Sequence, residues 1–242
     1  MHPFTQYHFN ALFMTGKERR CRKRSIEKYV NEEMNNPGDY GSVNCLHYYK
    51  CIFFPIPKAA GLSVSKTLFG SLGPCHITYD WYVENFGIHT VNAYYKFTFV
   101  RNPWDRLHSA YFFLKKGGVN EEDKKFAEKY LSNINGFEDF VMNWLTKDKF
   151  DMYWHLMPQF KFITSAKDRD KIIVDFLGRF EDLQNDFSDI TSKLGFKNAK
   201  LENVNGNKEK LSSYINDYSK EMSDKVAGLY HQDIQLLNYK FS

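Results

Sequence analysis

Two short stretches of the sequence carry residue types that could hold a phosphorylated ligand. The first surrounds Lys58 with small residues directly after an apolar run that ends at Phe54, and it reads Pro57-Lys58-Ala59-Ala60-Gly61-Leu62-Ser63-Val64. Small side chains let the oxygens of an anion reach backbone N–H groups, and the lysine adds a full positive charge. The second stretch combines the guanidinium of Arg101 with the hydroxyl of Ser109. A planar cation and a hydroxyl donor suit a second phosphate group.

Both stretches are predicted to follow a strand and to open a helix. Residues 46–54 form an apolar run that suits a buried strand, and residues 94–100 are rich in aromatic and β-branched side chains. Further along, residues 171–180 predict a third strand, residues 181–194 a helix and residues 219–237 a closing helix. Alternating strands and helices favour a single α/β domain with a central parallel sheet flanked by helices. Ligands of such sheets bind beyond the carboxyl ends of the strands.

The helix that begins at Asn102 has two distinct faces. Asn102 is a good capping residue, and Pro103 suits the first helical position. At 100° per residue one face collects the apolar residues Trp104, Leu107, Tyr111 and Leu114. Asn102, Arg106 and Ser109 fall nearly opposite, and we expect this polar face to meet water or a ligand. Residues 137–145 are also amphipathic and are expected in the core.

Composition narrows the class of protein. The 242 residues include 22 Phe and 16 Tyr, which favours a well-packed aromatic core. A net charge of +4 is too small to predict a nucleic-acid partner.

Four cysteines without a CxxC motif predict buried thiols and no zinc site. Without a membrane span or a signal pattern, a soluble cytoplasmic protein is expected. Residues 1–36 are predicted as an arm and basic helix packed on a domain of residues 37–242.

The loop at Lys58 is not a Walker A loop. In that motif a glycine directly precedes a Lys-Ser/Thr pair, whereas here Lys58 comes before Gly61 and no such pair follows at the required spacing. Hydrolysis of nucleoside triphosphates is therefore disfavoured. Two separate anion sites on one sheet edge instead suggest a nucleotide that carries two separate phosphate groups.

With these two motifs the sequence resembles the sulfotransferases that use 3′-phosphoadenosine-5′-phosphosulfate (PAPS), and in particular their carbohydrate-type, family 2-like branch. Residues 57–63 resemble the 5′-phosphosulfate loop, and residues 101–111 resemble the 3′-phosphate motif. Weaker similarities are found at residues 155–159, at residues 178–181, at Asn205 and at residues 230–241. Two positions depart from the family pattern, because Ala59 replaces a common threonine and Leu62 replaces a residue that usually carries a hydroxyl.

The resemblance implies a P-loop-NTPase-like sulfotransferase fold, PAPS as donor, 3′-phosphoadenosine-5′-phosphate (PAP) as product, and no metal. Sulfuryl transfer to an alcohol needs fixed cations and a base for the acceptor proton. Lys58 is expected to supply the charge, and His89, placed like the catalytic histidine of heparan-type members, is expected to be the base. His155 and Glu84 are alternative bases or acceptor contacts. The residues expected to bind the donor are Lys58, Ala59, Ala60, Gly61, Leu62, Ser63, Val64, Arg101, Ser109 and Asn205.

The acceptor is expected to be a saccharide or a small hydroxylated metabolite. Two other functions stay open on the sequence: a kinase-like phosphotransferase, and a non-catalytic protein of the same fold that binds nucleotides or glycans. The sequence gives no indication of the oligomeric state.

Overall fold

The computed structural model describes residues 46, 49–70, 76–196, 199–201 and 214–241. The predicted arm over residues 1–36 and the predicted ligand contact Asn205 lie outside these ranges. The chain forms two compact units, each assembled from three segments. We call Met1–Ile56, Ala60–Phe99 and Lys161–Val204 the sheet unit, and Pro57–Ala59, Val100–Phe160 and Asn205–Ser242 the helical unit.

The sheet unit is built on a three-stranded sheet with the order β1-β2-β5, where β1 is Cys51–Phe54, β2 is Tyr95–Val100 and β5 is Phe176–Arg179. Strands β1 and β2 are parallel, with Cys51 opposite Tyr95 and Phe54 opposite Thr98. The parallel sheet with helices between its strands confirms the predicted α/β class. The strand predicted over residues 46–54 begins only at Cys51, because Lys50 adopts a left-handed backbone with φ 53° directly before it.

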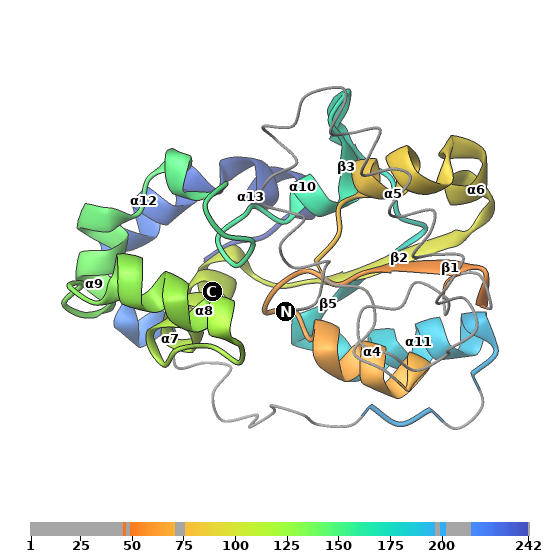
Figure 1. The fold of residues 1–242 in the computed structure, drawn as a ribbon, viewed down its shortest axis with the longest axis horizontal. Helices are drawn as coiled ribbons and strands as arrows, with labels where there is room; N and C mark the ends of the chain where they lie inside the picture. Colours follow the sequence, from red (N-terminus) through yellow and green to blue (C-terminus); the bar gives the residue numbers. More distant parts are fainter. Residues whose placement is uncertain (1–45, 47–48, 71–75, 197–198, 202–213, 242) are drawn as a thin grey trace. The chain divides into compact units, whose positions relative to one another are not determined.

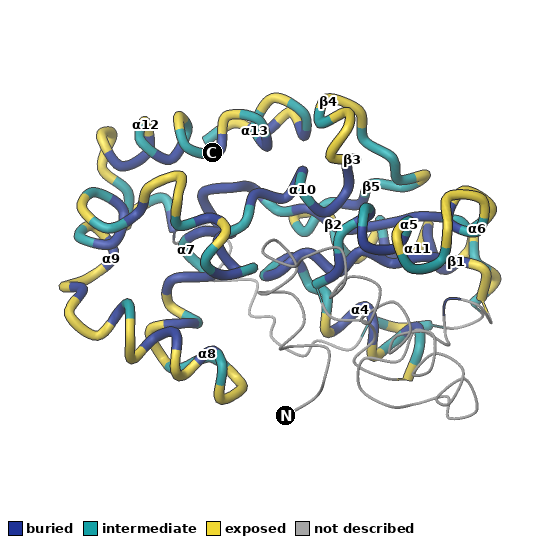
Figure 2. Tube along the Cα trace, turned by 45° about the horizontal axis from the view of Figure 1, so that its top comes forward, coloured by how far each residue is buried: buried dark blue, intermediate teal, exposed yellow. Residues whose placement is uncertain are grey.

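Helices cover both faces of this sheet (Figure 1). Helices α4 (Gly61–Phe69) and α11 (Leu183–Leu194) lie on one face, and α5 (Tyr79–Phe86) and α6 (Ile88–Ala93) lie on the other. Alternate strand residues point to opposite faces, so Phe53 and Phe97 pack toward α4 and α11 while Phe54 meets Tyr82 of α5. Both strands are accordingly buried along their length (Figure 2).

The strand predicted over residues 171–180 is two strands in different sheets. Strand β4 (Asp168–Ile172) pairs antiparallel with β3 (Thr164–Ser165), whereas β5 joins the main sheet. Between them Asp175 turns toward β2, where its carboxylate accepts a hydrogen bond from the backbone N–H of Lys96 at 2.8 Å. An apolar run alone does not reveal this change of sheet.

The helical unit is organised around α7 (Pro103–Lys115). Its other helices are α8 (Glu121–Phe126), α9 (Gly136–Asp139), α12 (Lys220–Leu229) and α13 (His231–Leu237), and π-helical turns occur at Ala127–Leu131 and Phe140–Trp144. Helix α10 (Phe160–Ile163) begins in this unit with Phe160 and continues in the sheet unit. Short 3-10 turns occur at Lys147–Lys149 and Tyr214–Asp217 here, and at Phe180–Asp182 in the sheet unit. The closing helix predicted over residues 219–237 is therefore two helices, which meet at Tyr230.

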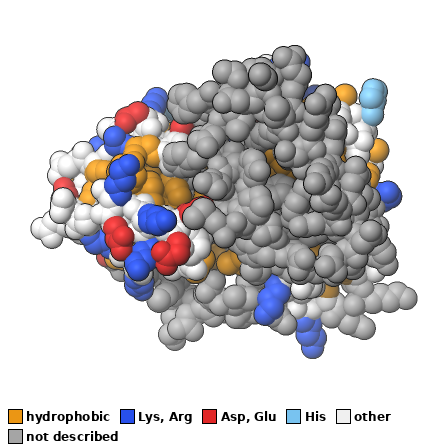
Figure 3. Space-filling view, in the orientation of Figure 1, with side chains coloured by type: hydrophobic (Ala, Val, Ile, Leu, Met, Phe, Trp, Pro, Cys, Tyr) orange, Lys and Arg blue, Asp and Glu red, His pale blue; other side chains and the backbone are white. Residues whose placement is uncertain are grey.

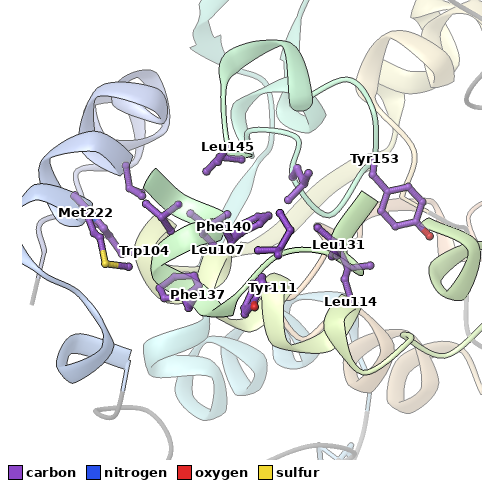
Figure 4. Packing of buried hydrophobic residues seen from close by; sticks show 14 of the residues in the cluster. Trp104, Leu107, Tyr111, Leu114, Leu131, Phe137, Phe140, Leu145, Tyr153 and Met222 are labelled. Carbon is purple, nitrogen blue, oxygen red and sulfur yellow. The ribbon is translucent and has the colours of Figure 1, made fainter. Parts of the chain in front are cut away.

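The apolar face of α7 lies in the core, as predicted (Figure 4). It packs against residues 137–145, which confirms that this segment is also core. The expectation that Arg106 faces water or a ligand is wrong. Arg106 is fully buried, because residues 155–157 cover its side of the helix, and its guanidinium donates to the carbonyl oxygens of His155 at 3.3 Å and Met157 at 2.8 Å.

On the face shown in Figure 3, acidic and basic side chains are interspersed over the described part of the surface. Within the described ranges no helix is both long and apolar enough to span a membrane. Cys51 is a buried thiol, and the other three cysteines lie outside the described residues.

Candidate functional site

The loop between β1 and α4 has an unusual backbone. Lys58 and Ala60 both adopt left-handed conformations with φ 66°, which residues with a side chain seldom take. Gly61 is needed for a different reason, because a Cβ added there would lie 3.0 Å from the Cβ of Pro55. Strained backbone of this kind concentrates at ligand-binding and catalytic sites.

Helix α4 begins without a capping side chain. Ala60 occupies the N-cap position and makes no side-chain cap, and the first turn contains no acidic residue. The N–H groups at the start of a helix have no partner within the helix, and the helix dipole is positive at this end. Gly61, Leu62 and Ser63 therefore present backbone N–H groups of the kind that bind anions at helix starts.

Lys58, which belongs to the helical unit, lies against an aromatic ring of the same unit. Its Nζ lies 3.7 Å from the centroid of the Phe113 ring on α7. Burial and, to a smaller extent, the positive charge of Arg101 lower the pKa of Lys58 to about 8, while Asp123 acts in the opposite direction. A lysine in these surroundings gains from a bound anion, because the anion restores the stability of its charged form.

Behind Phe113 the aromatic rings continue as a stack. Phe113 and His155 have ring centroids 4.9 Å apart, and His155 and Tyr153 have centroids 5.3 Å apart. The hydroxyl of Tyr153 donates to the buried carboxylate of Asp123. His155, only 5% exposed, is thus a packed side chain of the helical unit, which argues against its expected contact with an acceptor.

Arg101 connects the two predicted anion-binding stretches. Its Nε and Nη2 donate to the two carboxylate oxygens of Asp105, each at 2.7 Å, and its Nη1 donates to the backbone oxygen of Lys58 at 3.0 Å. The side chain is only 12% exposed. Ser109 follows two turns further along α7 and is half-buried. The guanidinium therefore reaches the Lys58 loop, as two neighbouring anion sites would require.

Comparison with known proteins decides the family. The model of the Sulfotransferase family matches residues 47–240, which include both of the predicted anion-binding stretches. This chain belongs to the sulfotransferase family. An uncharacterized protein of Archaeoglobus fulgidus is 32% identical over 117 residues, which is 48% of this chain and 80% of that protein. No solved structure matches the chain.

In this sulfotransferase His89 does not lie in a loop beside the anion sites. It is an exposed residue of α6, which leads into the amino end of β2, whereas α4 begins beyond the carboxyl end of β1. Because β1 and β2 are parallel, these positions lie at opposite ends of the strands (Figure 1). A six-residue strand is about 20 Å long, so the structure separates His89 from the start of α4. Glu84, on α5, is exposed as well.

A different histidine lies beside the start of α4. The Nδ1 of His76 is 2.5 Å from the carbonyl oxygen of Pro55, the same residue that Gly61 approaches closely. A carbonyl oxygen only accepts, so Nδ1 is the nitrogen that carries the hydrogen in this contact. No signal in the sequence marks His76, because its nearness to Pro55, 21 residues away, comes from the fold and not from a local motif.

The described residues include no group of three or more His, Cys, Asp or Glu side chains that could hold a metal ion.

Proposed function

We propose that this sulfotransferase transfers the sulfuryl group of PAPS to the hydroxyl of an acceptor. The hydrogen bond from Arg101 to the backbone oxygen of Lys58 is the observation that carries the proposal. It joins two cationic residues that follow adjacent parallel strands, and PAPS has two anionic groups on one adenosine. The family membership supports the same donor.

The two ends of the donor are assigned by the chemistry of each stretch. Lys58 and the amides at the start of α4 suit the 5′-phosphosulfate, together with the small residues of the loop. Arg101 and Ser109 suit the 3′-phosphate, because a guanidinium and a hydroxyl both donate hydrogen bonds to phosphate oxygens. Ala59, Ala60 and Asn205 remain proposed donor contacts. Val64 does not, because its side chain is buried in the core of the sheet unit and its N–H donates to the carbonyl oxygen of Ala60. Backbone N–H groups bind an anion whatever the side chain, so Ala59 and Leu62 are compatible with this role.

The transfer step needs one nucleophile, one leaving group and one base. The acceptor oxygen forms a bond to sulfur while the bond from sulfur to the phosphate oxygen breaks, and PAP leaves with the negative charge. The charge of Lys58 is placed to stabilise that departing oxygen. The acceptor proton goes to Nε2 of His76, which we propose as the base in place of His89, because His76 lies beside the start of α4.

The acceptor class is proposed from the reaction and the family branch. An alcohol is the nucleophile that a neutral histidine can activate, and a saccharide or a small hydroxylated metabolite provides one.

Incubation of the protein with PAPS labelled with sulfur-35 and pooled saccharide and small-molecule acceptors tests the function. We expect label to move to an acceptor without added Mg²⁺, and we expect calorimetry to detect PAP binding. A protein that binds PAP but transfers no label to any acceptor would be a binding protein of this fold. A protein that instead moves the γ-phosphate of ATP in the presence of Mg²⁺ would be a phosphotransferase, and either result overturns the proposal.

The affinity for PAP is expected to fall at alkaline pH because of Lys58. Its pKa of about 8 in the ligand-free protein means that the ammonium is intact below about pH 7 and lost above pH 8. A bound anion favours the charged form, so binding takes up a proton and weakens by about tenfold between pH 7 and pH 9. Calorimetric titrations across this range measure the slope. Lys58→Arg keeps its charge throughout and is expected to show a flat profile, and an equal slope in both proteins would contradict the assignment.

A further inference from the structure

Gln159 makes an unusual contact with the backbone of Arg101. Its side-chain Oε1 accepts a hydrogen bond from the N–H of Arg101 at 2.9 Å, and its Nε2 donates to the carbonyl oxygen of the same residue at 2.8 Å. Gln159 is fully buried. One side-chain amide thus binds both polar groups of one backbone residue, as a neighbouring strand would.

The contact involves Arg101, the residue proposed to bind the 3′-phosphate of the donor. Arg101 directly follows the end of β2 and directly precedes the capping residue of α7. Two hydrogen bonds to its backbone fix the orientation of both adjoining peptides, and so fix where the side chain starts. The guanidinium then reaches Asp105 and the Lys58 oxygen with bonds of 2.7 to 3.0 Å.

Gln159 is itself held rigidly from its own backbone. The carboxylate of Asp233, a buried residue of α13, accepts from the N–H groups of Gln159 and Phe160, each at 2.8 Å. The buried guanidinium of Arg106 on α7 donates to the carbonyl oxygens of His155 and Met157, which begin the same segment. Two buried and opposite charges therefore hold residues 155–160 through hydrogen bonds to backbone groups.

We infer that Gln159 is a positioning residue for recognition of the donor's 3′-phosphate, acting through Arg101. The inference rests on the proposed function, since it assumes that Arg101 binds this phosphate. A glutamine is required by its chemistry, because only a neutral amide of this length both donates and accepts at Arg101. Leucine fills a similar volume without either bond, and an ionised glutamate accepts from the N–H but cannot donate to the carbonyl.

The test compares two nucleotides that differ in the 3′-phosphate. Calorimetry with PAP and with adenosine 5′-phosphate is done on the wild-type protein and on Gln159→Leu. Loss of two hydrogen bonds that orient Arg101 is expected to weaken PAP binding by about tenfold or more and to change adenosine 5′-phosphate binding by less than about twofold. A merely structural role would weaken both nucleotides alike, and that result, or unchanged PAP binding, overturns the inference. Gln235→Leu, an exposed position on α13, is the matched control and is expected to bind both nucleotides as the wild type does.

The wild-type measurement separates this inference from the proposed function. If the wild-type protein binds PAP no better than adenosine 5′-phosphate, the proposed 3′-phosphate site itself is wrong.

If Gln159→Leu fails to fold, Gln159→Glu replaces it, because the glutamate side chain has nearly the same shape as glutamine. At pH 8 the glutamate variant is expected to lose PAP affinity selectively relative to the wild type. At pH 5.5 the loss is expected to shrink, because a protonated carboxyl can donate to the Arg101 carbonyl again. An equal deficit at both pH values would overturn the inference.

Discussion

Replacing His76 with alanine is expected to lower the rate of sulfuryl transfer by about two orders of magnitude or more, while PAP binding changes little. The ring loses its role as proton acceptor, but the cations that hold the nucleotide remain. The turnover rate at saturating PAPS and calorimetry with PAP measure the two effects separately. His76→Asn refines the test, because its side-chain amide can still donate to the Pro55 oxygen but cannot accept the acceptor's proton.

His89→Ala is the control for this prediction and is expected to retain nearly the wild-type rate. The opposite pattern, with a slow His89 variant and a normal His76 variant, would return the role of base to His89. A His76→Asn variant as active as the wild type would show that His76 only supports the loop at Pro55. Loss of PAP binding in both His76 variants would point to the same structural role.

Lys58→Ala is expected to reduce the transfer rate by about 10²- to 10³-fold, the usual effect of removing one group that stabilises charge in the transition state. The PAP affinity should fall as well, because the ammonium lies in the loop that precedes the anion-binding start of α4. Single-turnover rates and calorimetry provide both values. Lys66→Ala removes a lysine on the exposed side of α4 and is the matched control. Equal behaviour of the two variants would show that Lys58 does not act on the donor.

The local features of the site were predictable from the sequence. Asn102 caps α7 by accepting from the N–H of Trp104, and Pro103 occupies the first turn, as the dipeptide indicated. The helix start at Gly61 was indicated just as locally, although the left-handed backbone of Lys58 and Ala60 was not. Neighbouring residues determine such features, so a single sequence contains the information.

The features that depend on distant contacts were not predictable. Arg106 was expected to face water or a ligand because the helical pattern shows one apolar face, and nothing local indicates that residues 155–157 cover the other face. Gln159 acts on Arg101 across 58 residues, and His76 reaches Pro55 across 21. His89 was expected to be the base because it is placed like the catalytic histidine of heparan-type members, but a position along the chain does not reveal at which end of the strands a residue lies.

The strand boundaries failed for a related reason. Residues 171–180 contain enough apolar residues to predict one strand, yet the partner of each part decides its sheet. Ile172 lies opposite Thr164 in a hairpin, whereas Phe176 begins the strand beside β2. Competition between two possible partners is a tertiary effect, which side-chain alternation does not encode.

The division into interleaved segments limits how this protein can be cut. The sheet unit takes its last segment from Lys161–Val204, after most of the helical unit has been passed, and the helical unit takes its first from Pro57–Ala59. No contiguous fragment contains one unit without most of the other. Neither unit can therefore be produced alone by truncation, and a tag or fusion partner belongs at a terminus rather than at a boundary between the units.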